Sequence, residues 1–279
     1  MKSHAELLGN FLNYHFSQRG EWPSGHASLV DSTRYSLLQE GSKRFRPVLA
    51  MLTAEALGFP APRVLPLGAA IECIHTYSLV HDDLPAMDND DFRRGQPTNH
   101  KKFGEATAIL AGDALLTEAF QILADNYSAE PDLAVRVISE TAKAAGLYGM
   151  VGGQAIDMAS KKETISLQEL QTMHQLKTGA LIRLSAVGAA ILCRANERQM
   201  VDITKYAEAL GLAFQVADDL LDYDPEKLEP GSYPALMGAE DTRLFLDQIT
   251  ESCLSQLRMW PAAAEPLRQI AVYNRQRKK

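Results

Sequence analysis

Apolar residues recur every three or four positions through most of the chain, and strict two-residue alternation is absent. Proline marks where several of these stretches begin or end: Pro47 and Pro66 stand at helix starts, and Pro85 forces the chain out of a helix that ends near Asp83. Leu8, Phe11, Leu12 and His15 form a helical stripe near the start of the sequence, introduced by the capping-box pattern Ser3-x-x-Glu6. The pattern predicts further helices at about residues 47–57, 66–83, 105–125, 131–146, 149–159, 168–194, 200–222, 234–258 and 262–275. We therefore expect an all-α protein.

No feature of the pattern marks a domain boundary. The breaks at 58–66, 84–103 and 223–233 have the length of loops inside one unit, and no repeat or Gly/Ser/Pro-rich linker interrupts the chain. Two segments, 66–81 and 180–193, are apolar around most of their circumference, which is typical of helices inside a bundle or in a subunit interface. We predict one domain over residues 1–279, a single large helical bundle, which forms a homodimer.

Composition narrows the class of protein. The chain has 279 residues, 46% of them hydrophobic, enough to bury a core without disulfides or a structural metal. Lys and Arg total 28 and Asp and Glu total 35, so the net charge is −7, which argues against nucleic-acid binding. The three cysteines are far apart, and no stretch reaches the roughly 20 uninterrupted apolar residues of a membrane span. We expect a cytoplasmic protein with reduced cysteines, no nucleic-acid partner and no membrane span.

The first unusual segment is acidic. Five aspartates lie within residues 82–91, at the end of the predicted helix 66–83. Carboxylates this close raise one another's pKa unless a cation lies among them. Mg²⁺ takes oxygen ligands and usually keeps waters or phosphate oxygens in its shell. By itself the segment is either part of a magnesium site or a solvated acidic loop.

A second acidic helix end favours the magnesium site. Gln215, Asp218 and Asp222 are spaced i, i+3 and i+7, so they share one face of the predicted helix 200–222. Apolar residues surround them, and carboxylates on a buried helix are costly unless they line a cavity that holds cations. Two such helix ends in one bundle predict a metal cluster held from opposite walls.

Basic residues suggest what the metal would serve. Three lie within residues 43–46, at a predicted helix N-terminus, which is a favourable place for a phosphate. Arg93 and Arg94 follow the first acidic segment, and Lys177 lies inside the predicted helix 168–194. Acidic clusters beside fixed Lys and Arg side chains suit a diphosphate. The chain has neither a P-loop nor a dinucleotide fingerprint, so a nucleotide is not the expected ligand.

These segments resemble the motifs of the trans-isoprenyl diphosphate synthases, also called polyprenyl synthetases, and most closely those of the bacterial farnesyl diphosphate synthases. The resemblance runs from about Tyr35 to the C-terminus. It is carried by SKRFRP at 42–47, ECIHTYSLVHDD at 72–83, RGQPT at 94–98, FGE at 103–105, GMVGGQAID at 149–157, KTG at 177–179 and QVADDLLD at 215–222. It implies an isoprenoid-synthase-like bundle around a central active-site cavity. The implied activity is Mg²⁺-dependent, head-to-tail condensation of isopentenyl diphosphate with dimethylallyl or geranyl diphosphate to farnesyl diphosphate.

The resemblance also assigns roles to individual residues. Three Mg²⁺ ions would be bound by Asp82, Asp88 and Asp218, supported by Asp83 and Asp222. The allylic diphosphate would contact Arg93, Lys177 and Gln215, and isopentenyl diphosphate would contact Lys43, Arg46, His75 and Arg94. The Thr178 carbonyl and the Gln215 amide oxygen would face the allylic cation, so the catalytic residues would be Lys177, Thr178, Gln215 and Arg93, with Thr178 also counted among the substrate-binding residues.

Helix geometry suggests a product length. Tyr77 and Ser78 lie five and four residues before Asp82, about one turn, or ~5.4 Å, below the metal-binding end. A chain growing along this helix would meet the Tyr77 ring early, which favours a C15 or C10 product over long polyprenyl chains. The alternative is that Tyr77 is an ordinary core residue.

Two departures from the family pattern keep other functions open. Only residues 223–232 separate Asp222 from Tyr233, where the family usually carries a longer loop with a lysine on the allylic diphosphate; Lys227 is the nearest substitute. Ser42 replaces the usual second glycine before Lys43. The alternatives are a geranyl or geranylgeranyl diphosphate synthase and a low-activity or non-catalytic subunit of such an enzyme. A terpene cyclase is less favoured, because it would not need a pocket for a second diphosphate.

Overall fold

The structure, a computed structural model, describes residues 2–17, 23–39, 41–160, 165–227 and 231–277. Helices make up nearly all of its regular structure, and in the described residues the only sheet is a two-stranded antiparallel pair. The all-α class predicted from the sequence is confirmed. The chain divides into two compact units, Met1–Met51 with Val64–Ile138 and Leu52–Arg63 with Ser139–Lys279, each described by itself below. The single domain over residues 1–279 stays a prediction.

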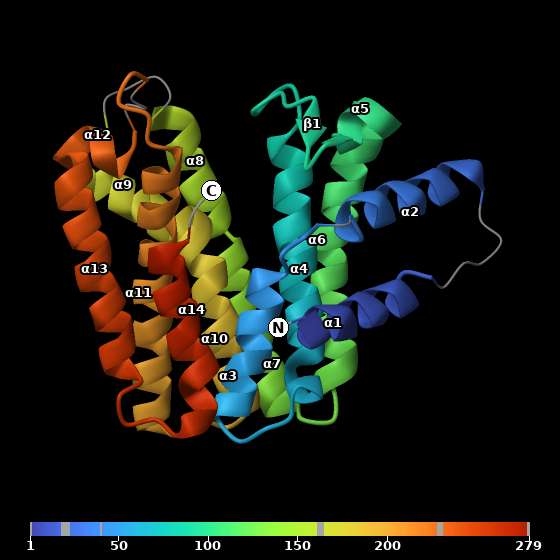
Figure 1. The fold of residues 1–279 in the computed structure, drawn as a ribbon. Helices are drawn as coiled ribbons and strands as arrows, with labels where there is room; N and C mark the ends of the chain where they lie inside the picture. The colour runs from blue at the N-terminus through green and yellow to red at the C-terminus, as the bar shows by residue number, and fades with distance from the viewer. Residues whose placement is uncertain (1, 18–22, 40, 161–164, 228–230, 278–279) are drawn as a thin grey trace. The chain divides into compact units, whose positions relative to one another are not determined.

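The first unit is built on a pair of long helices. Its elements are α1 (Lys2–His15), α2 (Ser24–Leu37), the first part of α3 (Phe45–Ala56), α4 (Leu65–Asp82), β1 (Phe92–Arg93), β2 (Gln96–Pro97), α5 (Asn99–Phe103), α6 (Glu105–Tyr127) and the first part of α7 (Pro131–Ala145). Helices α4 and α6 run side by side along most of their length (Figure 1). Nearly every residue of α4 from Leu65 to Tyr77 is buried, as the all-round apolar pattern predicts.

Helix α6 buries one side and leaves apolar residues on the other. Leu115, Ala119 and Ile122 are fully buried, whereas Ile109 and Leu110 are 45% and 54% exposed. By length and composition alone α6 could cross a membrane, with a mean hydropathy of 1.3 over 18 residues, 39% of which are buried. A single helix of this kind is weak evidence, because core helices of soluble proteins pass the same test.

The second unit is arranged around α11. Its elements are the ends of α3 and α7, η1 (Ala61–Val64), α8 (Met150–Ser160), α9 (Leu167–His174), η2 (Gln175–Gly179), α10 (Ala180–Leu192), α11 (Glu197–Asp222), α12 (Tyr233–Met237), α13 (Ala239–Gln256), η3 (Ala262–Ala264) and α14 (Glu265–Gln276). Helices α10, α13 and α14 all pack against α11 (Figure 1). Helix α10 is apolar all round, and eleven of its thirteen residues are buried.

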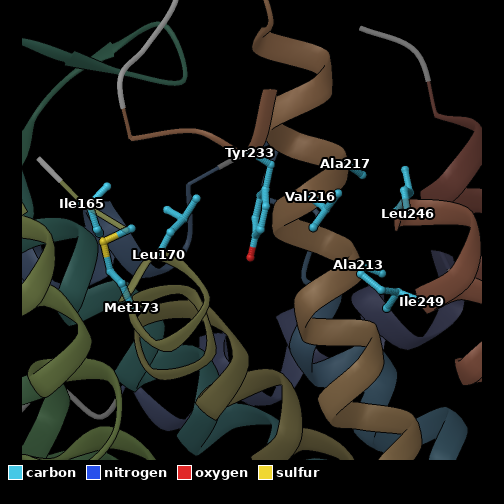
Figure 2. Packing of buried hydrophobic residues seen from close by; sticks show 9 residues of the cluster. All are labelled: Ile165, Leu170, Met173, Ala213, Val216, Ala217, Tyr233, Leu246 and Ile249. Carbon is cyan, nitrogen blue, oxygen red and sulfur yellow. The ribbon is translucent and has the colours of Figure 1, made fainter. Parts of the chain in front are cut away.

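A cluster of buried side chains joins α9, α11, α12 and α13. Figure 2 shows Tyr233 lying between Leu170 on α9 and Val216 on α11, and both of these side chains are fully buried. The His174 ring lies 5.5 Å from the Tyr233 ring. Burial lowers the pKa of His174 to about 4, so this core histidine is neutral at pH 7.

The predicted helices match the observed ones closely, but the stretch 84–103, predicted to be a loop, contains β1, β2 and the short helix α5. Three further differences concern the longer helical segments. Helix α2 was not predicted, because its four serines together with Gly25, Asp31 and Arg34 leave it almost no net hydrophobicity. The predicted helix 234–258 is split into α12 and α13 at Gly238, whose φ is +86°. The predicted helix 168–194 is continuous but contains a π-helical turn, η2, at residues 175–179.

Candidate functional site

The first acidic segment forms a tight turn at the end of α4. The Asp88 N–H donates to the Asp82 carbonyl at 2.8 Å, which folds the chain back so that the two aspartates share one turn. Asp82 is half-buried and Asp88 is exposed. The turn therefore offers two carboxylates from one short segment, as the magnesium-binding role that the resemblance implies for these two residues requires.

Asp83, next to Asp82, is buried and pairs with an arginine. Its carboxylate is 4% exposed and accepts hydrogen bonds from Arg93 Nε at 2.8 Å (Oδ1) and 3.0 Å (Oδ2). Burial raises the pKa of Asp83, and the Arg93 guanidinium opposes that shift. Asp83 thus fixes Arg93, for which the resemblance implies contact with the allylic diphosphate, and this position is compatible with a supporting role for Asp83.

Arg94 lies in a two-residue hairpin turn between β1 and β2. Arg94 and Gly95 have φ values of +52° and +74°, as a type I′ turn requires. An arginine in this left-handed conformation costs about 1 kcal/mol or more, a strain that is typically retained at functional positions. The turn places Arg94 on a small cavity of the first unit, together with His75 and Arg93.

Positive charge gathers around His75. Burial lowers the pKa of His75 well below 6.5, and the charges of Arg46, Arg94, Arg93 and Arg44 lower it further. His75 is therefore neutral at pH 7 and can donate a hydrogen bond without adding charge. The structure brings together His75, Arg46, Arg93 and Arg94, an environment that favours an anion. Lys43, the remaining predicted contact to isopentenyl diphosphate, is exposed.

A buried ion pair organises the basic segment before α3, and the sequence did not reveal it. Arg44 Nη1 lies 2.6 Å from Glu72 Oε1, with the two side chains 9% and 3% exposed. Arg44 has a φ of +49° and also donates to the Leu37 carbonyl. Ser42 Oγ donates to the same Glu72 oxygen at 3.3 Å, so the serine that replaces the family's glycine joins this network.

Tyr77 and Ser78, the predicted chain-length residues, lie one turn before the acidic segment. Tyr77 is 6% exposed, and its ring meets the His81 ring edge-on with centroids 5.7 Å apart. Ser78 donates to the His75 carbonyl at 2.9 Å. Burial, together with the charge of Asp82, raises the pKa of Tyr77 to about 12, so the phenol is neutral.

His81 lies against a glycine of the neighbouring helix. A Cβ atom at Gly112 on α6 would lie 2.0 Å from His81 Nε2, and that nitrogen is 3.0 Å from the Ile109 carbonyl oxygen. Gly112 thus allows the histidine beside the first acidic motif to contact the backbone of α6.

Gly112→Ala is expected to lower the free energy of unfolding by about 1–3 kcal/mol, because the imidazole must leave its place and lose its contacts with Tyr77 and Ile109. Urea denaturation measures this change. Gly9→Ala on α1 is the matched control, since nothing lies within 4 Å of its new Cβ, and it should be neutral or stabilising by up to about 1 kcal/mol. Equal stability of the two variants would contradict the packing argument.

The second acidic motif lies on α11. Gln215 and Asp218 are half-buried and Asp222 is exposed, at the predicted i, i+3 and i+7 positions. Asp218 Oδ1 is 2.6 Å from Arg277 Nη2, a contact that the sequence did not predict. Asp219 accepts a hydrogen bond from the Tyr233 N–H at 2.9 Å, so this neighbouring aspartate anchors the start of α12.

The KTG segment forms the π-helical turn η2, where hydrogen bonds span five residues instead of four. Lys177 Nζ lies 2.7 Å from Asp157 Oδ2 on α8. Two glycines of neighbouring helices lie very close to this turn, where a larger residue would clash. An added Cβ at Gly153 would lie 2.2 Å from Lys177 N, and one at Gly211 would lie 2.9 Å from Gly179 Cα. π turns often mark functional sites, and Thr178 lies within this one.

The shortened loop lies partly outside the described residues. Glu229 and Pro230, within the stretch that lacks the family lysine, are among the residues not described. Lys227, the proposed substitute, is exposed, and its N–H donates to the Asp224 carbonyl at 3.1 Å.

The donor set fits a magnesium ion that is completed by its substrate. In the described part of the chain, no group of three or more His, Cys, Asp or Glu residues could hold a metal on its own. Mg²⁺ is commonly held by one or two carboxylates together with phosphate oxygens and waters. Asp82 and Asp88 on one turn supply such a pair in the first unit, and Asp218 supplies a carboxylate in the second.

Comparison with known proteins identifies the family. The polyprenyl synthetase family model matches residues 27–231. A farnesyl diphosphate synthase of Geobacillus stearothermophilus is 46% identical over 238 residues, covering 79% of this chain and 80% of that protein. A geranylgeranyl diphosphate synthase of Cyanophora paradoxa is 41% identical over 264 residues, covering 89% and 88%. The apo crystal structure of an FPP/GFPP synthase from Zymomonas mobilis has a TM-score of 0.88 at 38% identity, covering 98% of this chain and 97% of that one.

The chain therefore belongs to the polyprenyl synthetase family. The family, the all-α fold and the prenyltransferase function predicted from the sequence are confirmed. The roles of the individual site residues remain predictions and are proposed below.

Proposed function

We propose that the protein condenses isopentenyl diphosphate head-to-tail with dimethylallyl and then geranyl diphosphate, giving farnesyl diphosphate. The observation that carries this proposal is the group of arginines around the neutral His75, beside the acidic turn at the end of α4. Such a pairing of cations for phosphate with carboxylates for a metal suits two diphosphate substrates. Relatives that cover most of the chain carry the name farnesyl diphosphate synthase.

We assign the magnesium ligands to Asp82, Asp88 and Asp218, with three Mg²⁺ ions in the complete site. When bound, the ions would neutralise charge on the departing diphosphate. Asp83 would act indirectly, through the guanidinium of Arg93. Asp222 would contribute through water, in line with its exposure.

The chain's own basic and polar side chains would bind and orient the two substrates. Arg93, Lys177 and Gln215 would contact the allylic diphosphate and stabilise the charge that develops when its C–O bond breaks. Lys177 now pairs with Asp157 and would have to exchange that carboxylate for the diphosphate. Lys43, Arg46, His75 and Arg94 would hold isopentenyl diphosphate.

The allylic carbocation needs negative dipoles and exclusion of water. The Thr178 carbonyl in the π turn and the Gln215 amide oxygen would supply the dipoles. The isopentenyl double bond attacks the cation, forming the new C–C bond, and the released diphosphate takes the proton lost from the adduct. No side chain then needs a tuned catalytic pKa.

A homodimer is the proposed assembly, and α6 is the proposed contact. Its exposed Ile109 and Leu110 form an apolar face that a second copy of the chain could cover. The cytoplasmic location and the absence of a membrane span likewise stay predictions.

Incubating the purified protein with dimethylallyl and isopentenyl diphosphates and Mg²⁺ tests the proposal. We expect release of inorganic diphosphate and a C15 product, and we expect EDTA to abolish both. A C20 product would favour the alternative of a geranylgeranyl diphosphate synthase, the name that the Cyanophora paradoxa relative carries. No diphosphate release from a folded sample would favour the non-catalytic subunit.

A further inference from the structure

The C-terminal arginine lies on the face of α11 that carries the second acidic motif. Arg277 directly follows α14, and its Nη2 lies 2.6 Å from Asp218 Oδ1 and donates to the Phe214 carbonyl at 2.8 Å. The guanidinium carbon is 4.4 Å from the centroid of the Phe214 ring. Phe214 and Asp218 are four residues apart, so the guanidinium covers one full turn of the helix.

Helix α14, which precedes Arg277, is held in place by its neighbours. Helix α14 packs against both α11 and α13, and Tyr206 on α11 donates to the Leu267 carbonyl on α14 at 2.7 Å. The Arg277 side chain is 12% exposed and that of Asp218 is 33% exposed. The pair is therefore partly shielded from solvent, which strengthens its electrostatic attraction relative to a fully exposed pair.

Arg275, two residues earlier, pairs with exposed carboxylates instead. Its Nη1 lies 3.4 Å from Glu251 and 3.8 Å from Asp247, and those carboxylates are 68% and 58% exposed. Arg275 is thus an ordinary surface cation on the same helix, whereas Arg277 meets a carboxylate that we assign to metal binding.

We propose that Arg277 is a resident counter-cation of the second acidic motif, which neutralises Asp218 in the ligand-free protein and must release it when a divalent cation binds there. The inference rests on the proposed function, because it takes Asp218 as a metal ligand. A guanidinium and a divalent cation on one carboxylate repel each other, so the two compete. The Arg277 Nε is buried and, among the described residues, makes no hydrogen bond, which makes the bound position of the arginine easier to give up. Arg277, directly after α14, thereby sets how readily the motif takes up metal.

Direct metal binding tests the inference without relying on turnover. Mn²⁺ binding in the presence of inorganic diphosphate is measured by electron paramagnetic resonance for the wild type, Arg277→Gln and Arg275→Gln. We expect Arg277→Gln to bind Mn²⁺ on the order of 5- to 10-fold more tightly, a size typical of coupled sites. Arg275→Gln removes a charge of the same sign two residues earlier, at the end of α14, and should change the affinity less than about 2-fold.

Two further variants separate charge from packing. Arg277→Lys keeps the charge and should bind Mn²⁺ as the wild type does, whereas loss of packing alone would make it resemble Arg277→Gln. In an Asp218→Asn background, Arg277→Gln should have no effect, because the competition acts through the carboxylate.

Equal or weaker Mn²⁺ binding by Arg277→Gln in the presence of diphosphate would overturn the inference. If its binding were weaker with diphosphate but unchanged without it, Arg277 would be a phosphate contact instead. These outcomes leave the proposed function intact. If the wild type shows no saturable Mn²⁺ binding with diphosphate, both the inference and the metal role of Asp218 fall.

Discussion

Asp82→Asn is expected to lower kcat by about 10²–10³-fold while the fold is kept, because it removes one anionic oxygen from the proposed magnesium site and so weakens the charge stabilisation of the leaving diphosphate. The change is nearly isosteric, and Asp82 is half-buried at the end of a helix whose packing comes from residues 65–77. The apparent Mg²⁺ concentration for half-maximal rate should rise at the same time. Steady-state kinetics across a Mg²⁺ titration, with thermal melts of both proteins, measures these effects.

Asp113→Asn on α6 is the control, since this aspartate is exposed and lies outside the proposed site. It should leave the rate and the Mg²⁺ dependence unchanged. Should Asp82→Asn behave like this control, the acidic turn would be a solvated surface loop, the alternative that the sequence left open.

Tyr77→Ala is expected to shift the main product from C15 to C20 or longer. The ring lies within α4 about 7.5 Å before Asp82 along the helix axis, so its removal opens space in the path proposed for the growing chain. Mass spectrometry of dephosphorylated products measures the shift. Loss of a buried aromatic ring costs about 3–5 kcal/mol of stability, so Tyr77→Leu, which keeps part of the packing, is the second variant.

Tyr127→Ala controls for the loss of stability. Tyr127 is also a buried tyrosine of the first unit, 4% exposed, and its hydroxyl accepts from the Leu67 N–H at 3.3 Å near the opposite end of α4. This variant should be destabilised without longer products. An unchanged C15 product from folded Tyr77→Ala and Tyr77→Leu would show that Tyr77 is a core residue only.

The sequence predicted elements whose signal is local and strong. The all-round apolar pattern of 66–83 predicted α4 to within a residue of Leu65–Asp82, and the i, i+3, i+7 spacing predicted the shared face of Gln215, Asp218 and Asp222. Helix α2 was missed because a helix with little net hydrophobicity is stabilised by contacts with α4, α5 and α6 that no local pattern records.

Ion pairs between residues far apart in the sequence could not be predicted either. Lys177 and Asp157, or Asp218 and Arg277, are brought together by packing of separate helices, so charge type and spacing gave no sign of these contacts. The π turn at 175–179, which lies against Gly153 and Gly211 of other helices, was missed as well. The residue types of the site were therefore predictable, and their present partners were not.

The hydrogen bond from Tyr233 to Asp219 has a consequence for how this protein can be altered. It fixes the point where the chain returns to α11, and the buried Tyr233 ring secures that point within the second unit. Any connection between Asp219 and Tyr233 therefore has its two ends held close together. Doubling the length of a closed connection costs only about 0.6 kcal/mol in closure entropy, so a family-length connection could be grafted there with little effect on the stability of the rest of the molecule.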